Sequence, residues 1–422
     1  MVISGFENSK KTSIIFWTSL VVFWLFFPVL GMFLGLLLFG LLRKEDVPSL
    51  LLFTLIALTF GLIAYSAKSA SAGDPTDIVR YTNQFSWMSS ASSFSEIVVA
   101  LFLSDGSFYI VFHSLTLLLA KTFPNNPQVL PLFWVSVSYL FLLFGIVELT
   151  KYKEAASKGA IFFLIFLALF GTTLFPQQVE LLKQATATPV FFYGIFRFIN
   201  GKNKGILISF IALFIHFSVI IFFPLFFVKR TTLLIRYFFP LLALAFLFAA
   251  IDPVKLIGYL SGGLLLEKSE FYSGLDEWKI NKINYLLFAI YTIVTLFLNS
   301  IGVSRISVKH NKSILGQHLL SANNWLFLIL TVQLSNGHNF ARYTYLYSPA
   351  YILAVWLLIM TKIPKSWKSN ALIGVLFVYL LLNASYFLVY SNSSYKNDFL
   401  DGSVRQALFY RVDQILNCRV VN

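Results

Sequence analysis

Cysteine and charge are both scarce in this chain. The single cysteine, Cys418, excludes an intrachain disulfide and a metal site built from cysteines. Charged residues make up only 12% of the 422 residues, which is far below the share in soluble domains. The five histidines are widely separated and no Asp-x-Asp sequence occurs, so no spacing typical of a metal site is present.

The N-terminal residues also lack the pattern of a cleavable signal peptide. Ile14 to Leu42 is one long apolar run, longer than the core of a signal peptide, and no small-residue cleavage site follows a short apolar segment. We expect this segment to be retained as a membrane span.

Hydrophobic runs dominate what is present. Hydrophobic residues make up 58% of the sequence and the mean hydropathy is +0.78. Many runs reach the roughly 20 residues that a helix needs to cross about 30 Å of hydrocarbon. Helices also satisfy their own backbone polar groups, as a bilayer requires. The sequence therefore predicts an all-α, polytopic integral membrane protein with about 11–13 transmembrane helices, re-entrant or broken segments and extracytoplasmic loops.

The expected spans follow from apolar length. They are residues 14–42, 49–67, 129–149, 159–175, 185–200, 205–228, 231–250, 282–301, 319–335, 346–362 and 370–390. Residues 107–120 are expected to form an interfacial or re-entrant helix. We treat residues 1–390 as one membrane domain, followed by a polar C-terminal tail at 391–422.

Basic residues fall in small groups between the spans, which is typical of cytoplasmic loops and not of a nucleic-acid-binding face. The net charge is +14. The groups are Lys10-Lys11, Arg43-Lys44, Lys151/Lys153/Lys158, Lys202/Lys204, Lys229-Arg230, Arg305/Lys309/Lys312 and Lys362/Lys365/Lys368. We expect no nucleic-acid partner. With these groups inside, the segments 68–128, 176–184, 251–280 and 335–345 are expected to lie outside.

Two segments are basic at both ends although each has the length of one span. Residues 205–228 lie between two basic groups, which predicts a break near His216 and a return of the chain. Residues 14–42 have the same pattern and contain Pro28 and Gly31. For them we expect a single long tilted helix.

Some polar residues are not explained by the orientation of the chain in the membrane. Lys183, Gln184 and His216 lie at or inside apolar segments, where ionisable groups are costly and are functional by default. A lone histidine in such a stretch can also be a satisfied core or helix-break residue.

Two outside segments add further candidates. Asp77 and Tyr81 are four residues apart and would share a helix face beside Arg80, although Asp74 and Pro75 also fit a simple helix start. The last outside segment combines His338 and Arg342 with several tyrosines, including Tyr343. Such tyrosines are typical of an interfacial belt, whereas arginine also suits phosphate oxygens.

These motifs in their order resemble those of the EpsG and Wzy-type polysaccharide polymerases. The set covers about residues 60 to 360: Asp77-x-x-x-Tyr81, Asp105-Gly-Ser-Phe-Tyr109, Lys183-Gln184-Ala185, Ile215-His-Phe-Ser218 with Pro224, and Arg342-Tyr-x-x-x-Tyr347. Two positions depart from the family pattern. Lys183 stands where the family usually has arginine, and Pro75 where it has glycine. Lysine supplies a point charge to phosphate but no bidentate contact.

The resemblance implies a membrane glycosyltransferase of the bacterial inner (cytoplasmic) membrane, which polymerises oligosaccharide repeat units into O-antigen or exopolysaccharide. The donor would be a glycan on undecaprenyl pyrophosphate, attacked at its reducing-end sugar by an acceptor hydroxyl. No cofactor and no metal are expected, because fixed cations would stabilise the leaving pyrophosphate. The expected partners are undecaprenyl-pyrophosphate-linked glycans, membrane lipids, a chain-length regulator and a flippase.

Residue roles follow from this reaction. Asp77 is the expected general base, and His216 supports the acceptor or shapes the cavity. The expected substrate-binding residues are Arg80, Tyr81, Lys183, Gln184, His338, Arg342 and Tyr343. A flippase of the same lipid-linked units and a non-catalytic scaffold are the alternatives. A flippase should carry charge through the middle of its spans, whereas these residues lie near one face.

Overall fold

The chain is helical throughout the part that the structure describes. The structure is a computed structural model, and it describes residues 3–41, 49–66, 77–91, 93, 95–96, 109–151, 158–172, 175–228, 282–301, 313–335, 348–361, 366–375, 378, 380 and 408–417. No strand occurs within these ranges, and the expected all-α class is confirmed.

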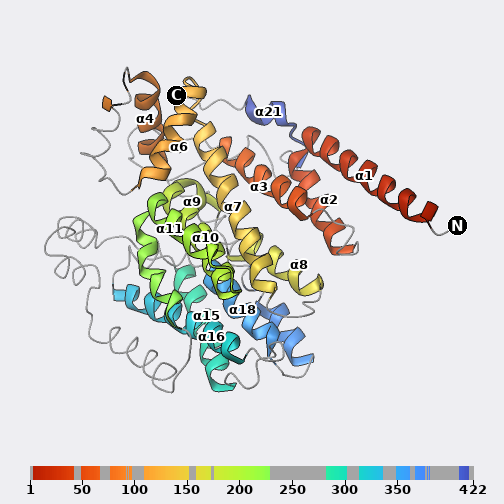
Figure 1. The fold of residues 1–422 in the computed structure, drawn as a ribbon, viewed down its shortest axis with the longest axis vertical. Helices are drawn as coiled ribbons and strands as arrows, with labels where there is room; N and C mark the ends of the chain where they lie inside the picture. The colour runs from red at the N-terminus through yellow and green to blue at the C-terminus, as the bar shows by residue number, and fades with distance from the viewer. Residues whose placement is uncertain are drawn as a thin grey trace.

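The elements are shown in Figure 1. In chain order they are α1 (Ile3–Phe26), α2 (Pro28–Leu41), α3 (Ser49–Tyr65), α4 (Asp77–Ser90), α6 (Ile110–Thr122), α7 (Val129–Thr150), α8 (Lys158–Leu167), the π-helix η3 (Ala168–Thr172), α9 (Phe175–Glu180), α10 (Leu182–Ile199), α11 (Lys204–Ile215), the 3-10 helix η4 (Phe217–Phe226), α15 (Lys282–Ile301), α16 (Ser313–Val332), η6 (Gln333–Ser335), α18 (Ser348–Met360) and α21 (Val412–Leu416).

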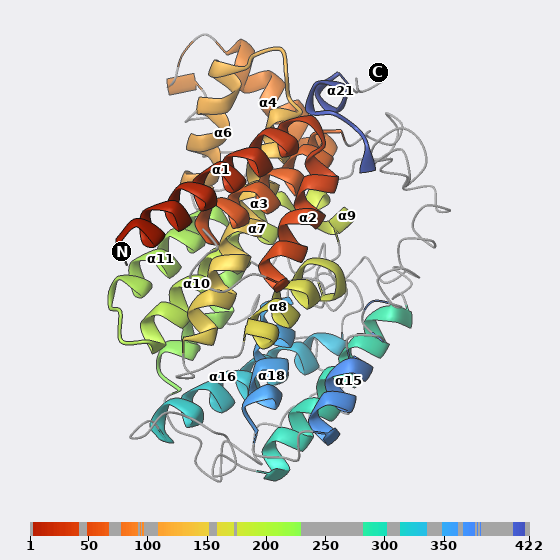
Figure 2. The ribbon, with the colours of Figure 1, turned by 90° about the vertical axis from the view of Figure 1, so that its right-hand side faces the viewer.

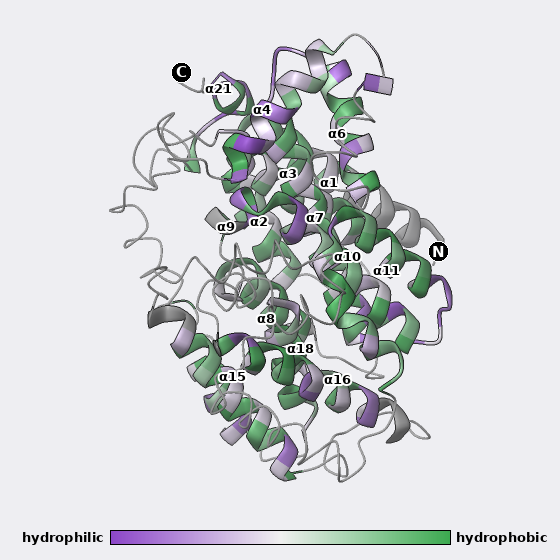
Figure 3. Cartoon of the chain, turned by 90° about the vertical axis from the view of Figure 1, so that its left-hand side faces the viewer, coloured by the Kyte–Doolittle hydropathy of each residue, from purple (hydrophilic) through white to green (hydrophobic). Residues whose placement is uncertain are grey.

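Helix α7 is, among the described residues, the one helix long and apolar enough by itself to cross a membrane. Shorter apolar helices accompany it, and Figure 3 shows that α10 and α11 are mainly hydrophobic whereas α4 is mixed with polar residues. This composition is compatible with a polytopic membrane protein. The number of spans stays a prediction.

Helix α7 lies between α3 and α10 (Figure 1). The Phe60 ring of α3 stacks on Tyr139 of α7 with a centroid distance of 4.0 Å. Gly61 permits this approach, because a Cβ atom there would lie 2.6 Å from the Leu132 carbonyl oxygen. Small residues at helix interfaces are typical of membrane proteins, where close packing replaces the hydrophobic effect between helices.

A tight hairpin joins α10 to α11. Gly201 adopts a φ of 79°, its N–H donates to the Phe198 carbonyl, and the Lys202 N–H donates to the Arg197 carbonyl. This pair of bonds is the Schellman helix ending, which favours glycine because of the positive φ. The two helices then pack closely through Gly194 and Gly205, whose backbones approach each other directly.

A buried ion cluster lies where the α10–α11 turn meets the end of α7. The Glu148 carboxylate is buried and accepts from the Nζ atoms of Lys151 and Lys202, each at 3.0 Å, and from the Asn200 amide. The pairing offsets the cost of desolvating the carboxylate. It also ties the α10–α11 turn to the end of α7.

The expected single helix over residues 14–42 is wrong. Helix α1 ends at Phe26 and α2 begins at Pro28, and the two form a V in Figures 1 and 2. A Cβ atom at Gly35 would lie 3.7 Å from Leu20, although 15 residues of straight helix would separate them by about 22 Å. Proline lacks the N–H that helix continuation needs, which explains the break.

The expected break near His216 is confirmed. His216 has extended backbone angles (φ −154°, ψ 124°) between α11 and η4. The Phe223 ring of η4 lies 5.2 Å from the Phe210 ring of α11, and Phe226 lies 5.0 Å from Phe198. The chain therefore turns back along α11.

Part of the segment expected to be a polar tail packs on the helices. Ile415 of α21 is fully buried in a cluster with Trp24 and Leu55. The Tyr65 hydroxyl donates to the Leu416 carbonyl at 3.4 Å and accepts from the Asn126 amide at 2.8 Å. Helix α21 thus lies where α3 ends and α7 begins.

One of the remaining expected segments is described by the structure, and the others are not. Residues 107–120 contain helix α6 as expected, but its depth in a membrane stays a prediction. The expected span 231–250, the outside segment 251–280 and the helix start at Asp74 and Pro75 lie outside the described residues.

Two glycines at neighbouring helix interfaces should respond differently to alanine: Gly194 lies between α10 and α11, and Gly145 lies between α7 and α10. We expect Gly194→Ala to destabilise the protein by about 1–3 kcal/mol, because its Cβ would lie 2.3 Å from the Ser209 Oγ. Gly145→Ala is the matched control, since its Cβ has no neighbour closer than 3.8 Å and alanine favours the helix. Thermal melting in detergent should show a lower midpoint for Gly194→Ala only. Equal midpoints would contradict the close α10–α11 packing.

Labelling should place α4 and α21 on one side of the membrane and the α10–α11 turn on the other. Helices α4, α6 and α21 lie at one end of the molecule (Figure 1), whereas Lys202 lies at the Glu148 end of α7. In a Cys418→Ser background, Arg80→Cys and Asp413→Cys should react with an impermeant maleimide from the same side, and Lys204→Cys from the opposite side. Reaction of positions 204 and 413 from one side would contradict this arrangement.

Candidate functional site

A buried lysine lies among three aromatic rings near the start of α7. Lys183, in the first turn of α10, is only 5% exposed. Its Nζ atom lies 4.7 Å from the Tyr109 ring centroid and 5.2 Å from those of Tyr81 and Phe112. The negative face of an aromatic ring attracts a cation, and more strongly where water is excluded. We call Lys183, Tyr81, Tyr109 and Phe112 the lysine cage.

His216 adjoins the cage through Tyr109. The two rings stack with a centroid distance of 5.2 Å and an interplanar angle of 13°. The α11–η4 break therefore brings an imidazole to the ring that also contacts the lysine. Residues from α4, α6, α10 and the break at His216 meet here, although they are separated by up to 135 positions in the sequence.

Trp134 of α7 supports the cage from behind. Its ring stacks on Phe112 at 4.7 Å, and Phe112 in turn lies 5.7 Å from Tyr81. Trp134 and Phe112 are both almost fully buried. Because Trp134 lies in the second turn of α7, the cage lies near one end of that helix and not at its middle.

Asp77 and Tyr81 share a face of α4, as expected from their spacing. The Arg80 guanidinium donates to the Asp77 carboxylate, and Arg80 remains largely exposed, with 63% of its side chain accessible. A pair whose arginine is this exposed contributes little to stability. Asp77 lies one helical turn from the cage residue Tyr81.

One ring nitrogen of His216 caps the start of η4. Its Nδ1 atom accepts the backbone N–H of Ser218 at 3.2 Å and lies 2.7 Å from the Ser218 hydroxyl. Because Nδ1 accepts, the neutral ring carries its proton on Nε2; this tautomer is assigned from the geometry. The neutral imidazole is therefore a donor at Nε2.

Lys183 and Gln184 belong to the segment 176–184 that is expected outside, and its side of the membrane stays a prediction. The structure shows that this segment is helical, in α9 and the start of α10, and that both side chains are buried. Thr188 donates its hydroxyl to the Gln184 carbonyl. The apolar residues around these positions pack against α7, which explains why a polar sequence forms a buried helix start.

Three expected substrate-binding residues, His338, Arg342 and Tyr343, lie outside the described residues. Their roles stay predictions. Within the described ranges, no three His, Cys, Asp or Glu side chains come together in a metal-binding group.

Sequence reasoning missed Phe112 and His113. His113 is buried, with its ring 6.1 Å from Tyr109 and 5.7 Å from Phe112. The spacing of positions 109, 112 and 113 is that of one helix face, which was the signal available in the sequence. Tyr109 was part of a recognised motif, but no role had been given to it.

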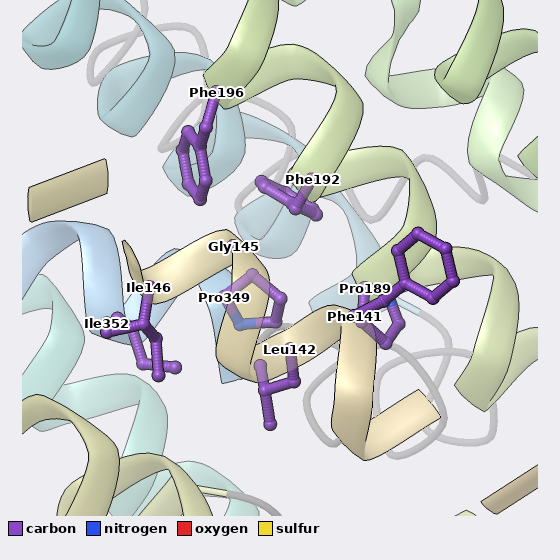
Figure 4. Close-up of a pocket in the computed structure, with 9 residues that line it drawn as sticks. All are labelled: Phe141, Leu142, Gly145, Ile146, Pro189, Phe192, Phe196, Pro349 and Ile352. Atoms are coloured by element: carbon purple, nitrogen blue, oxygen red, sulfur yellow. The ribbon is translucent and has the colours of Figure 1, made fainter. Parts of the chain in front are cut away.

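A separate cavity between α7, α10 and α18 does not belong to the site. Its nine lining residues, shown in Figure 4, are all apolar, and its volume is about 10 Å³. Such a space holds at most about one water and offers it no polar partner. Pro189 and Pro349 face it, so it reflects imperfect packing beside two prolines.

A double-mutant cycle should detect the contact between Lys183 and Tyr109. We expect Tyr109→Leu to lower the free energy of unfolding by less in a Lys183→Met background than in the wild type, with a coupling of about 0.5–2 kcal/mol. Melting in detergent gives the values. As a control, Phe53→Leu, which alters a ring packed on Phe144, should add to Lys183→Met without coupling. Full additivity at Tyr109 would contradict the cage.

Comparison with known proteins gives one match. The profile of the EpsG family matches residues 50–400, which is most of the 422-residue chain. No curated protein and no solved structure matches the chain. The matched range includes all four cage residues and His216, and it agrees with the resemblance seen in the motifs. The chain belongs to the EpsG family.

Proposed function

We propose that this chain polymerises oligosaccharide repeat units carried on undecaprenyl pyrophosphate, at the extracytoplasmic face of the bacterial cytoplasmic membrane. Membership of the EpsG family supports a membrane protein of polysaccharide assembly. The observation that carries the finer proposal is the convergence of a buried ammonium, two tyrosines and an imidazole from separate motif segments.

The reaction transfers a glycan from pyrophosphate to a hydroxyl. The acceptor oxygen bonds to the anomeric carbon of the donor's reducing-end sugar as the bond from that carbon to the pyrophosphate oxygen breaks. The hydroxyl proton passes to a base, and the lipid pyrophosphate leaves with the electron pair. The protein has to stabilise the leaving anion and accept the proton.

Lys183 suits the first task. The aromatic faces hold the Lys183 ammonium by cation–π attraction, and an ammonium supplies a point charge to a phosphate. The burial of Lys183 strengthens its attraction for a phosphate, because a charge acts through a lower effective dielectric there. Arg342, which lies outside the described residues, is proposed as a second phosphate ligand because its planar fork matches phosphate oxygens.

Asp77 suits the second task better than His216. The His216 Nδ1 atom already accepts from Ser218, and Nε2 carries the proton, so the neutral ring donates to substrate and does not take a proton there. Asp77 is a carboxylate one turn from the cage. We therefore propose Asp77 as the general base and His216 as a donor that orients the acceptor.

The position of the cage favours a polymerase over a flippase. A flippase has to move a charged headgroup past the middle of the membrane, whereas the cage adjoins the second turn of α7. The charged group at the other end of α7, around Glu148, is paired internally.

Reconstitution should test the reaction directly. Purified protein in vesicles with a lipid-pyrophosphate-linked repeat unit should give a ladder of products. Lys183→Met should abolish the ladder, because the leaving group loses its cation. Asp77→Asn should lower the elongation rate about 10²–10⁴-fold while donor binding is retained, since a general base contributes about that factor.

Lys204→Met is the matched control, because Lys204 is exposed at the far end of α10 and α11. It should elongate at the wild-type rate. Wild-type protein that binds the donor but yields no ladder would refute the polymerase. Full elongation by Asp77→Asn would instead refute the role of that residue alone.

A further inference from the structure

The start of α10 contains a backbone carbonyl that its own helix cannot satisfy. Pro189 lies inside α10 and has no N–H, so the Ala185 carbonyl four residues earlier lacks its usual partner. The Ser138 hydroxyl of α7 donates to this carbonyl at 2.9 Å. Ser138 and Ala185 are both buried. A buried carbonyl without a partner destabilises the fold, and the serine avoids this cost.

Ser138 also joins the preceding helix. Its Oγ atom also donates to the Gln178 side-chain carbonyl of α9 at 2.9 Å. A serine hydroxyl has one hydrogen, so the Ala185 and Gln178 oxygens share it. One hydroxyl of α7 therefore fixes both helices that flank the break at Leu181.

Lys183 lies inside the segment held in this way. It is two residues before Ala185 and five after Gln178. The Thr186 hydroxyl donates to the Trp134 carbonyl at 3.1 Å, and Trp134 stacks on the cage residue Phe112. Helix α7 thus fixes the lysine backbone through Ser138 and supports one of its rings through Trp134.

We infer that Ser138 is a positioning residue for Lys183: by capping the carbonyl released by Pro189, it holds the start of α10 so that the ammonium points into the cage. The catalytic part of this inference rests on the proposed polymerase. The structural part does not, because it concerns only hydrogen bonds between α7, α9 and α10.

Four variants test the inference. Ser138→Ala removes the cap, and Ser138→Thr keeps the hydroxyl. Ser136→Ala is the matched control on the same helix, because the Ser136 hydroxyl is buried with no hydrogen-bond partner among the described residues. Pro189→Ala returns an N–H that can donate to Ala185, so it should make the cap partly redundant.

Hydrogen exchange of peptides covering residues 178–188, measured without substrate, gives the structural readout. Ser138→Ala should raise the exchange rate about threefold to tenfold, as expected for one hydrogen bond. Ser138→Thr and Ser136→Ala should exchange as the wild type does. In the Pro189→Ala background, Ser138→Ala should have a smaller effect. An equal effect in both backgrounds, or none in either, would overturn the inference.

Elongation kinetics give the second readout, at a temperature well below the melting point of every variant. Ser138→Ala should lower kcat about threefold to tenfold with little change in acceptor KM, because only the leaving-group cation is displaced. Wild-type kinetics of Ser138→Ala, with Lys183→Met inactive, would overturn the positioning role. If the wild type makes no polymer but the exchange pattern holds, the polymerase proposal fails and the hold of Ser138 on α10 stands.

Discussion

The shape of this fold depends on its backbone polar groups, because each of them needs a hydrogen-bond partner in an apolar environment. A proline inside a helix releases a carbonyl, and at two such prolines a side chain of a neighbouring helix donates to that carbonyl. Pro189 releases the Ala185 carbonyl to Ser138. In the 3-10 helix η4, Pro224 cannot donate to the Ile221 carbonyl three residues earlier, and the Trp325 indole of α16 donates there instead.

Buried charge is managed in two different ways at the two ends of α7. Glu148 is surrounded by Lys151, Lys202 and an amide, so its charge is compensated and the group acts as a clamp. Lys183 lies against three aromatic rings, whose negative faces attract its ammonium. Carboxylate–ammonium pairs therefore stabilise one buried group, and ring faces contribute to the stabilisation of the other.

The sequence alone predicted the helical class from the apolar length of its segments. It also predicted the break at His216, from the basic residues on both sides of that segment. It also identified Tyr81 and Lys183, which the structure brings together in the lysine cage, and His216, which stacks on the cage residue Tyr109. The prediction of one helix over residues 14–42 was wrong. Pro28 ends the first helix near Phe27, and the packing of Gly35 near Leu20 could not be seen in the sequence. Phe112, His113 and Ser138 were missed because an aromatic or a serine in an apolar helix looks like ordinary packing until its neighbours are known.

The breaks explain why the cage can exist at all. A straight helix over residues 205–228 would carry the chain about 35 Å away from the start of α11, whereas the break leaves His216 at the turn, beside Tyr109. An α10 without Pro189 would satisfy the Ala185 carbonyl internally and would not need Ser138. The same interruptions that cost backbone hydrogen bonds thus bring ionisable side chains of distant segments together near one end of α7.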